Sequence, residues 1–331
     1  MFLINKMVNV FDLILNNFDV KAHSYSKEKN IFKAKAYNKA INTLNTLGTK
    51  SLIIEDDIKQ SKLGKSLQEK ALHMLKTNVN LEGVNDICIQ KIKKIREISK
   101  IQSIGMVKAS QLVEENHIQN IEDLLQNQHL LNKKQIIGLK YHRDITTRIP
   151  RTEIVQHENY IQSVLSNLLR IFNHEIVGSY RRKKNESGDI DIIIGIDHPN
   201  GSEMKIITDE FIKKEYIPKD GIFAIGKTKF MGMCKLSNCK IFRRLDILIT
   251  SKDEYPFSLL YFTGNGEFNV KMREYAKKKG FTLNEKGLKN TKENKIVEHI
   301  FNNETDIFNF LKIKYLNPAD RQPCNFTIQN N

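Results

Sequence analysis

The sequence has no tryptophan and only 4 cysteines in 331 residues. So few cysteines cannot form the disulfide framework of a small secreted protein. Cys234 and Cys239 are the only close pair, and no second pair or histidine cluster is present to complete a zinc site. We therefore expect reduced thiols and an intracellular, reducing compartment.

Long apolar runs are also missing. No stretch approaches the roughly 20 continuous apolar residues that a membrane-spanning helix needs. The apolar start, residues 1–10, has no basic region before it and no small-residue cleavage site, so it does not resemble a secretory signal. These absences exclude a membrane protein and a secreted scaffold, and we expect no membrane partner.

Positive charge dominates what is present. Lysine and arginine number 53 against 38 acidic residues, which gives a formal net charge of +15. Such a balance favours a polyanionic partner. Asn, Lys and Ile recur throughout, as in proteins from AT-rich coding genomes of viral or protozoan type. Part of the lysine excess is therefore attributed to this codon bias rather than to binding of a polyanion.

The hydrophobic periodicity changes along the chain. Apolar residues recur at three- and four-residue spacing over residues 8–148, which predicts helices. From about residue 174 the runs EIVGSY, DIDIIIGI, KFMGMCKL and RRLDILIT predict strands, with helices over 153–172 and 203–215. A basic helix and a polar tail follow residue 266. We predict an α+β, multidomain chain with an all-α N-terminal part.

A short pattern occurs twice in the helical part. Gly64 follows Leu63, Gly105 follows Ile104, and each glycine precedes a helical stretch. A helix N-terminus directs backbone N–H groups at a phosphate, and glycine lets the backbone come close. The pair predicts two helix-hairpin-helix contacts to a phosphate backbone, with ordinary helix–turn–helix packing as the alternative.

The strongest chemical feature is GSYRR followed by GDID at residues 188–191. Successive residues of a strand face opposite sides, so Asp189 and Asp191 share a face while Ile190 turns to the core. Two carboxylates this close repel each other unless a cation lies between them, and Mg²⁺ prefers such oxygen ligands. A solvated strand edge is the alternative, and the apolar run that follows disfavours it.

A third acid lies in the run RRLDILI. Asp246 alternates with Leu245 and Ile247, so it can leave the core face. Three acids from adjacent strands can hold two metal ions roughly 3.5–4 Å apart, as two-metal phosphoryl transfer requires. Arg244 can orient Asp246 or the neighbouring acids.

The run GSYRRKKNESGDIDIII resembles the nucleotidyltransferase motif of the family X DNA polymerases, and nearly the whole chain resembles the beta type of this family. The segments KAYNKA, GLKY, RIPR, GKTKFMG, RRLDI, YFTG, FN, KMR and GFTLNE follow in family order. The resemblance implies a helical 5′-deoxyribose phosphate lyase domain with the first hairpin (1–85), a helix-hairpin-helix DNA-binding subdomain (86–148), a nucleotidyltransferase palm with a mixed β-sheet (149–258) and a small α+β nucleotide-selecting subdomain (259–331).

The resemblance also implies roles for the three acids. Asp189 and Asp191 would bridge two Mg²⁺ or Mn²⁺ ions. Asp246 would hold the catalytic ion and help to deprotonate the primer 3′-hydroxyl, which attacks the α-phosphate of an incoming deoxynucleotide.

Further residues match contact positions of the family. Those that would contact the incoming nucleotide are Arg148, Ser179, Arg182, Gly188, Tyr261, Phe262, Gly264 and Asn269. Those that would contact DNA are Lys33, Tyr37, Lys39, Gly64, Gly105, Lys229, Arg244 and Arg273. The basic helix over 268–279 has an apolar stripe, which suits phosphate contacts, although a solvated surface helix is the alternative.

In the N-terminal part, GKSLQEKALHML resembles the lyase segment of the family and places Lys70 at its Schiff-base lysine. Lys33, Tyr37 and Lys39 match positions around the 5′-phosphate. The implied chemistry is attack of the Lys70 amine on the abasic sugar, followed by β-elimination.

Five residues depart from the family pattern. Lys62 and Ser103 stand where the hairpins carry glycine, and Ser66 stands at the place of a helper lysine. They bear on the lyase and on a Na⁺ or K⁺ ion expected at a hairpin. Lys183 replaces a glycine and Gly266 an acid that contacts the base, so both bear on nucleotide affinity or fidelity.

The predicted function is a monomeric DNA-directed DNA polymerase with a lyase activity, which fills short gaps in base excision repair. Its partners would be gapped or nicked double-stranded DNA and deoxynucleoside triphosphates, in the nucleus, or in the cytoplasm if the source is a cytoplasmic DNA virus. One alternative is an end-joining or template-independent enzyme of the same family, which usually has an extra domain for which no room is expected before residue 10. The other is a catalytically silent DNA-binding protein, and the three acids argue against it.

Overall fold

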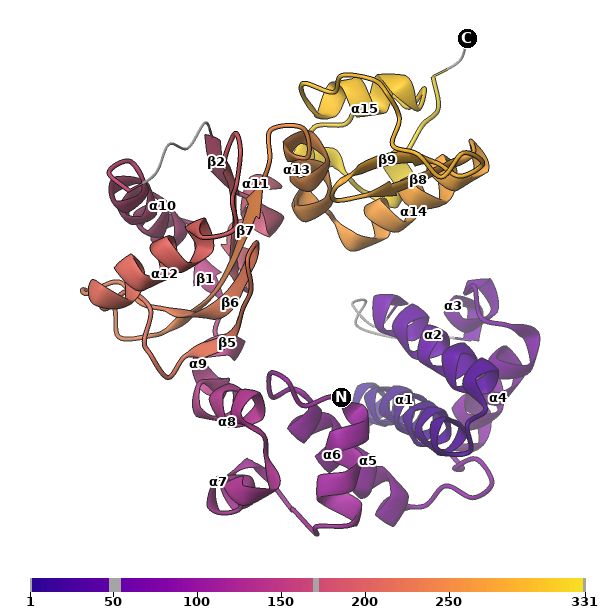
Figure 1. Ribbon diagram of the computed structural model, residues 1–331. Helices are drawn as coiled ribbons and strands as arrows, with labels where there is room; N and C mark the ends of the chain where they lie inside the picture. The colour runs from indigo at the N-terminus through magenta and orange to yellow at the C-terminus, as the bar shows by residue number, and fades with distance from the viewer. Residues whose placement is uncertain (1, 48–54, 169–172, 330–331) are drawn as a thin grey trace. The chain divides into compact units, whose positions relative to one another are not determined.

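The structure is a computed structural model that describes residues 2–47, 55–168 and 173–329. The chain forms two compact units, Met1–Leu131 and Asn132–Asn331, each with its own hydrophobic core (Figure 1). The division falls inside the segment 86–148 that the sequence predicted as one subdomain, because the helices after residue 131 belong to the second unit.

The first unit is helical throughout its described residues. Its elements are α1 (Phe2–Lys27), α2 (Ile31–Leu47), α3 (Glu55–Gln60), α4 (Lys65–Thr77), α5 (Asp86–Ser99), α6 (Met106–Glu114), α7 (Ile121–Gln126) and the 3₁₀ turn η1 (Gln128–Leu130). Helix α1 packs against α2, α4 and α5. The centre of this core is fully buried: Ile14 and Phe18, one helical turn apart on α1, pack with Leu44 of α2 and Met74 of α4.

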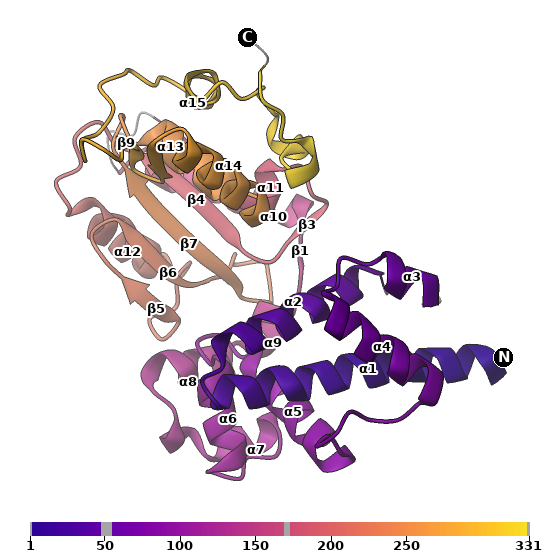
Figure 2. The same cartoon turned by 90° about the vertical axis from the view of Figure 1, so that its right-hand side faces the viewer.

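The second unit begins with α8 (Lys133–Lys140) and α9 (His142–Thr146) and continues around a five-stranded sheet. The sheet order is β2 (Asn173–Ile176), β4 (Ile190–Gly195), β7 (Arg243–Thr250), β6 (Lys229–Cys234) and β5 (Ile222–Ile225). β4 and β7 run parallel, side by side, and the other neighbours are antiparallel (Figure 2). The predicted mixed sheet is confirmed.

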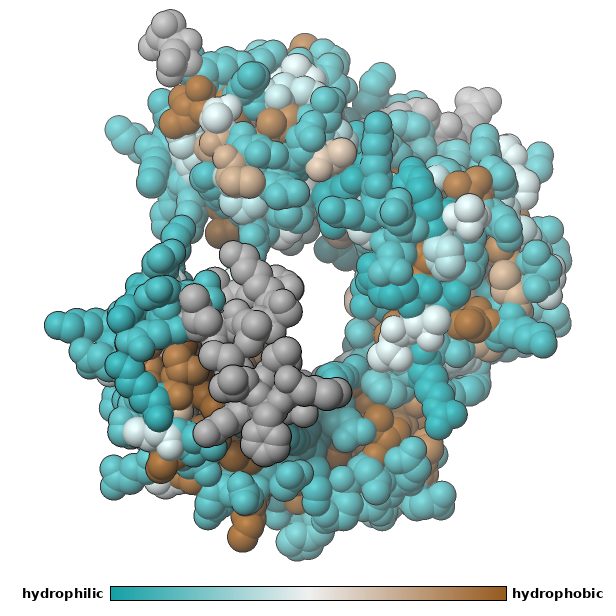
Figure 3. All heavy atoms as spheres, turned by 180° about the vertical axis from the view of Figure 1, so that it is seen from behind, coloured by the Kyte–Doolittle hydropathy of each residue, from teal (hydrophilic) through white to brown (hydrophobic). Residues whose placement is uncertain are grey.

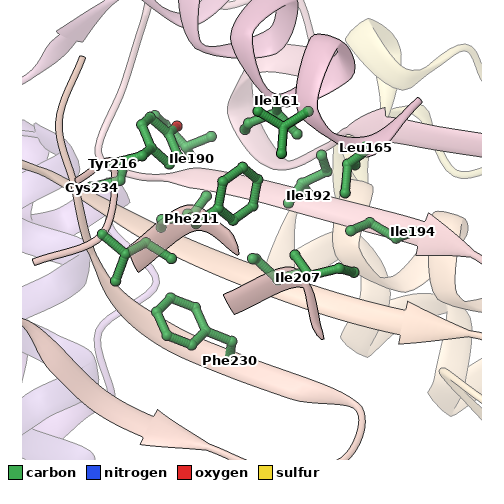
Figure 4. Packing of buried hydrophobic residues seen from close by; sticks show 14 of the residues in the cluster. Ile161, Leu165, Ile190, Ile192, Ile194, Ile207, Phe211, Tyr216, Phe230 and Cys234 are labelled. Atoms are coloured by element: carbon green, nitrogen blue, oxygen red, sulfur yellow. The ribbon is translucent and has the colours of Figure 1, made fainter. Parts of the chain in front are cut away.

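Helices cover both faces of this sheet. On one face, α10 (Arg151–Leu165) and α12 (Glu203–Lys213) pack Ile161 and Phe211 against the strands, where Ile192 lies (Figure 4). On the other face, α13 (Tyr255–Thr263) packs against Ile193 and Leu248. The central strands are therefore apolar on both faces, as sheets covered on both sides are.

One predicted strand is shorter than the sequence suggested. The run EIVGSY was expected to be extended, but β2 ends at Ile176 and Gly178–Arg181 forms a short helix, α11. Gly178 has φ +59°, a conformation that glycine adopts without strain, so the chain turns there. β3 (Glu186–Ser187) follows soon after this turn and pairs with the earlier β1 (Ile149–Pro150) to form a two-stranded ribbon.

The C-terminal part of the second unit is a smaller α+β assembly. Its elements are α14 (Gly266–Lys278), β8 (Phe281–Asn284), β9 (Gly287–Asn290), α15 (Glu304–Phe310) and the 3₁₀ turns η2 (Pro318–Asp320) and η3 (Pro323–Asn325). Phe268, Met272 and Ala276 form the buried stripe of α14 against Phe308 of α15. The predicted basic helix with an apolar stripe is confirmed.

A buried ion network holds this part against α11. Glu304 accepts hydrogen bonds from Arg321 Nη1 at 2.6 Å and from Arg181 Nη2 at 2.8 Å. Arg321 and Glu304 are almost fully buried, and charges so placed need partners. The network therefore fixes α11, which carries Arg181, relative to α15.

The surface is mainly hydrophilic. In the face shown in Figure 3, hydrophobic side chains form small separate patches. Among the described residues, no helix combines the length and the apolar character needed to cross a bilayer. All four cysteines are free thiols, as expected.

The buried His157 of α10 makes the stability of the second unit depend on pH. Its Nδ1 lies 2.7 Å from the Tyr216 hydroxyl, and burial lowers the pKa of His157 from 6.5 to about 4 despite the nearby Glu153. The unfolded chain thus binds a proton between these values that the folded chain does not, so stability falls as the pH falls from 6.5 to 4.

We expect His157→Asn to lose this dependence. Between pH 6.5 and 4, the free energy of unfolding should drop by roughly 3 kcal/mol more in the wild type than in the variant. Urea unfolding at a series of pH values measures the difference. Parallel pH profiles for the two proteins would contradict the prediction.

Candidate active site

Three carboxylates meet at one end of the paired strands β4 and β7. Asp191 lies opposite Asp246 in the β4–β7 register, and Asp189 comes directly before β4. Carboxylate oxygens of the three residues all lie within 4.8 Å of one another. Ile190 and Leu245, their neighbours in the chain, are fully buried on the other face. The predicted alternation therefore places all three acids together.

Burial and neighbouring carboxylates make two of these acids, Asp191 and Asp246, hard to ionise. Burial, with the carboxylates of Asp189 and Asp246 adding to it, raises the pKa of Asp191 to about 7. Burial also raises the pKa of Asp246 to about 6, which Arg244 partly opposes. A group of positive charges at this place would favour the ionised forms of both acids.

Arg244 supplies one such charge. Its Nη2 donates hydrogen bonds to Asp189 and, at 3.5 Å, to Asp246 Oδ2. The expectation that Arg244 orients the acids agrees with these contacts. One guanidinium charge cannot balance three carboxylates, so part of their mutual repulsion remains.

The residues present fit a divalent metal ion. Oδ1 of Asp246 is buried without a hydrogen-bond partner among the described atoms, which is costly for a carboxylate. All three side chains offer hard oxygen ligands of the kind that Mg²⁺ and Mn²⁺ take. The cluster is therefore a candidate divalent-metal site.

The Gly-Ser turn of α11 lies against this cluster. A Cβ atom at Gly178 would come within 2.5 Å of Asp191 Oδ2, so only glycine fits beside the acid. The Val177 N–H donates to the backbone oxygen of Asp191 at 2.8 Å, and the Ser179 hydroxyl donates to Ser187 at 2.7 Å. These contacts fix the turn at the start of β4.

A cavity of about 600 Å³ opens beside Asp189 and Asp191. All eight residues predicted to contact a nucleotide line it: Arg148, Ser179, Arg182, Gly188, Tyr261, Phe262, Gly264 and Asn269. They come from α11, α13 and α14 and from the loop residues that precede β1, follow α11, precede β4 and follow α13. The structure thus brings together residues that are far apart in sequence.

Several of these side chains hold one another in place. Arg182 Nη1 donates to the backbone oxygen of Thr263 at 2.5 Å, and Gly264 leaves it room, since a Cβ there would lie 3.2 Å from the same nitrogen. Asn269 Nδ2 donates to the backbone oxygen of Tyr261 at 2.6 Å. Burial lowers the pKa of Arg182, which Asp191 and Asp189 oppose.

Besides Arg244, two further predicted DNA contacts lie in the second unit. Lys229 is exposed at the start of β6, with its Nζ 5.4 Å from the Phe262 ring centroid. Arg273 is exposed on α14, away from the buried stripe. Both positions leave a cation free to meet a phosphate backbone.

In the first unit, both glycine hairpins precede helices as predicted. Gly64 is the N-cap of α4 and Gly105 that of α6, and neither helix has an acidic residue in its first turn. No atom lies within 4 Å of a Cβ built at either glycine. Ser103, in place of a glycine, has φ +70°. Each hairpin therefore offers open backbone donors to an anion.

The residues predicted for the lyase site lie on α2 and α4. Lys70 Nζ donates to the hydroxyl of Tyr37 at 2.9 Å, and Tyr37 is buried. Lys33 lies 4.9 Å from the Tyr25 ring centroid, and Lys39 is exposed on the same helix as Tyr37. The structure brings Lys70 to Tyr37 across 33 residues of sequence.

Sequence reasoning missed several residues at this site. Asn265 also lines the nucleotide cavity, and Arg181 and Arg243 make ion pairs next to it. Gly266, noted above as a departure from the family pattern, lines the cavity too. Arg243 carried a signal that could have been used. It shares the apolar face of its strand with Leu245, so it had to be buried and paired.

Comparisons with known proteins agree with this architecture. Three family models match successive parts of the chain: fingers domain of DNA polymerase lambda (residues 96–146), DNA polymerase beta palm (148–252) and DNA polymerase beta thumb (258–322). The three matches follow one another along the chain, and together they cover the end of the first unit and most of the second.

Curated relatives point the same way. DNA polymerase lambda of Arabidopsis thaliana is 28% identical over 86% of this chain and 57% of its own length, and that of Rattus norvegicus is 27% identical over 93% and 56%. DNA nucleotidylexotransferase of Xenopus laevis is 27% identical over 78% and 57%. The chain belongs to the family X DNA polymerases and is beta-like, and it spans little more than half the length of these relatives.

Repulsion among the acids predicts a stabilising substitution. In metal-free protein at pH 8, Asp191→Asn should raise the melting temperature by about 2 °C or more, because it removes a buried charge next to two others. Mg²⁺ or Mn²⁺ should raise the melting temperature of the wild type and not that of the variant. Differential scanning calorimetry measures both effects. A variant less stable than metal-free wild type would be evidence against the repulsion.

Proposed function

We propose that the protein is a DNA-directed DNA polymerase that fills short gaps during base excision repair. The observation that carries the proposal is the acid cluster next to a cavity lined by eight nucleotide-type contacts. The substrates would be gapped or nicked double-stranded DNA and deoxynucleoside triphosphates, and the net charge of +15 suits such a polyanion.

The residues have distinct tasks in this proposal. Arg148, Arg182 and Ser179 would hold the triphosphate through charge-assisted hydrogen bonds. The segment from Tyr261 to Gly264 would lie under the sugar, where close packing excludes a ribose hydroxyl. These contacts fix the α-phosphate in line with the primer end, and positioning is a large part of phosphoryl-transfer catalysis.

The acids would then act on the reacting atoms. Asp246 would accept the proton of the primer 3′-hydroxyl as its oxygen attacks the α-phosphate, and pyrophosphate would leave. Asp189 and Asp191 would bind divalent ions together with Asp246. When bound, two such ions neutralise the developing charge on the attacking and leaving oxygens.

The four predicted domains form part of the proposal. Lyase domain, DNA-binding subdomain, palm and nucleotide-selecting subdomain would occupy 1–85, 86–148, 149–258 and 259–331. Four further expectations stay predictions: a monomeric state, a Na⁺ or K⁺ ion at a hairpin, a viral origin, and a location in the nucleus or cytoplasm.

Template use distinguishes this proposal from its nearest alternative. The relatives include both a DNA polymerase lambda and a DNA nucleotidylexotransferase. We propose template-directed synthesis, because Arg273 and Lys229 leave exposed cations for a template and a primer strand. Primer extension with and without a template strand separates the two functions.

The second proposed activity is a 5′-deoxyribose phosphate lyase in the first unit. Lys70 would attack C1′ of the abasic sugar, and β-elimination would release the 5′ sugar phosphate. The Tyr37 hydroxyl, 2.9 Å from Lys70 Nζ, supports the proposal because it can orient the amine. Lys33 and Lys39 would hold the 5′-phosphate.

Replacing Asp246 tests the polymerase. Asp246→Ala should lower single-nucleotide insertion on a gapped duplex by far more than tenfold, a barrier rise well above ~1.4 kcal/mol, and leave DNA binding nearly unchanged. Asp209→Ala, which removes an exposed acid of α12 that pairs with Lys205, is the matched control. Insertion by Asp246→Ala within about tenfold of wild type would refute the role.

Replacing Lys70 tests the lyase separately. Lys70→Ala should abolish borohydride trapping of the protein on a preincised abasic duplex and leave primer extension intact, since Lys70 and the acids lie in different units. Lys76→Ala, on the same helix and paired with Glu55, is the control. Undiminished trapping of Lys70→Ala would mean that another amine is the nucleophile, and no trapping of the wild type would mean that the first unit is not a lyase.

A further inference from the structure

The buried guanidinium of Arg243 lies behind the proposed nucleotide site and has no part in the roles described so far. Its side chain is 4% exposed. Nε and Nη2 donate to the two carboxylate oxygens of Glu153, each at 2.7 Å. Nη1 donates to the backbone oxygens of Thr147 at 3.1 Å and Arg148 at 3.4 Å.

The segment that Arg243 holds carries a cavity residue. The Arg148 guanidinium lines the 600 Å³ cavity, and its Nη1 would lie 2.9 Å from a Cβ at Gly188. Ile149 pairs with Ser187 in the β1–β3 ribbon, directly before Gly188. The backbone of Arg148 is thus fixed on one side by this ribbon and on the other by Arg243.

The next residue along the strand holds the acids. Arg244 faces the opposite side of β7 and donates to Asp189 and Asp246. Two consecutive arginines of β7 therefore hold different parts of the site: Arg243 binds the segment that carries Arg148, and Arg244 binds the acid cluster. A shift at residue 243 would move the Arg148 segment relative to the acid cluster.

We propose that Arg243, held by Glu153, is a positioning residue that sets the place of the Arg148 guanidinium and thereby the affinity for the incoming nucleotide. The inference rests on the proposed polymerase function. Lysine cannot replace Arg243, because one ammonium cannot reach two carboxylate oxygens and two carbonyls in the planar fork geometry of a guanidinium.

The test compares nucleotide KM and kcat for insertion on a one-nucleotide gap. Arg243→Lys should raise the nucleotide KM about tenfold and change kcat and DNA affinity by less than about threefold. Glu153→Gln keeps one oxygen acceptor for Arg243 and does not touch the hydrogen bonds of Arg243 to the backbone oxygens of Thr147 and Arg148. The nucleotide KM of this variant should therefore rise less than that of Arg243→Lys. Phe211→Leu, which disturbs the same core away from the cavity, should lower the melting temperature and leave KM unchanged.

A double-mutant cycle shows whether Arg243 acts through Arg148. In an Arg148→Ala background, Arg243→Lys should add nothing to KM, because the side chain that it positions is gone. If Arg243→Lys does not fold, the double variant Arg243→Met with Glu153→Met replaces it, since no unpaired buried charge remains. A KM within twofold of wild type, or additive effects in the cycle, would overturn the inference.

Failure of the proposed function gives a different result. A wild-type protein that inserts no nucleotide would refute polymerase activity. The positioning role of Arg243 would then still be tested by nucleotide binding, measured as the rise in melting temperature that dATP and Ca²⁺ cause in each protein. This rise should be smaller in Arg243→Lys than in the wild type and unchanged in Phe211→Leu. Equal rises in the two variants would overturn the positioning role.

Discussion

Mutual repulsion of three half-buried carboxylates is the constraint on which the second unit depends. Asp189, Asp191 and Asp246 would move apart if their strands could separate, and the sheet prevents this. β4 and β7 are apolar on both faces beyond the acids, so helices packed on both sides hold them together. The extensive hydrophobic core thus holds together three carboxylates that repel one another and attract cations.

Three arginines paired with carboxylates are the second feature that holds this unit together. Arg244 faces the acids, Arg243 faces the core, and Arg181 links α11 to Glu304. Each one is paired at short range with a carboxylate, and each also contacts a segment that borders the cavity. Their planar, multidentate guanidinium groups fix several backbone segments at once, which a hydrophobic contact cannot do with the same directionality.

Local patterns predicted the local parts of this site. The period of two placed Asp189 and Asp191 on one face, and alternation placed Asp246 on the polar face of its strand. Pairing of Asp191 with Asp246 depends on strand register, which tertiary packing sets, so only the family resemblance indicated it. β5 escaped prediction because four residues between Gly221 and Gly226 are too few to show alternation. The partner of Arg181, Glu304, lies too far along the chain for any local pattern to show.

The parallel pairing of β4 with β7 also has a consequence for folding. Parallel neighbours cannot be joined by a tight turn, so this pairing is a long-range contact that closes a large loop and forms late relative to local helices and hairpins. Before it forms, Asp246 is remote from Asp189 and Asp191, and the chain pays no electrostatic cost. A nascent or partly folded chain therefore lacks the assembled acid cluster, and the candidate metal site exists only once the central sheet is complete.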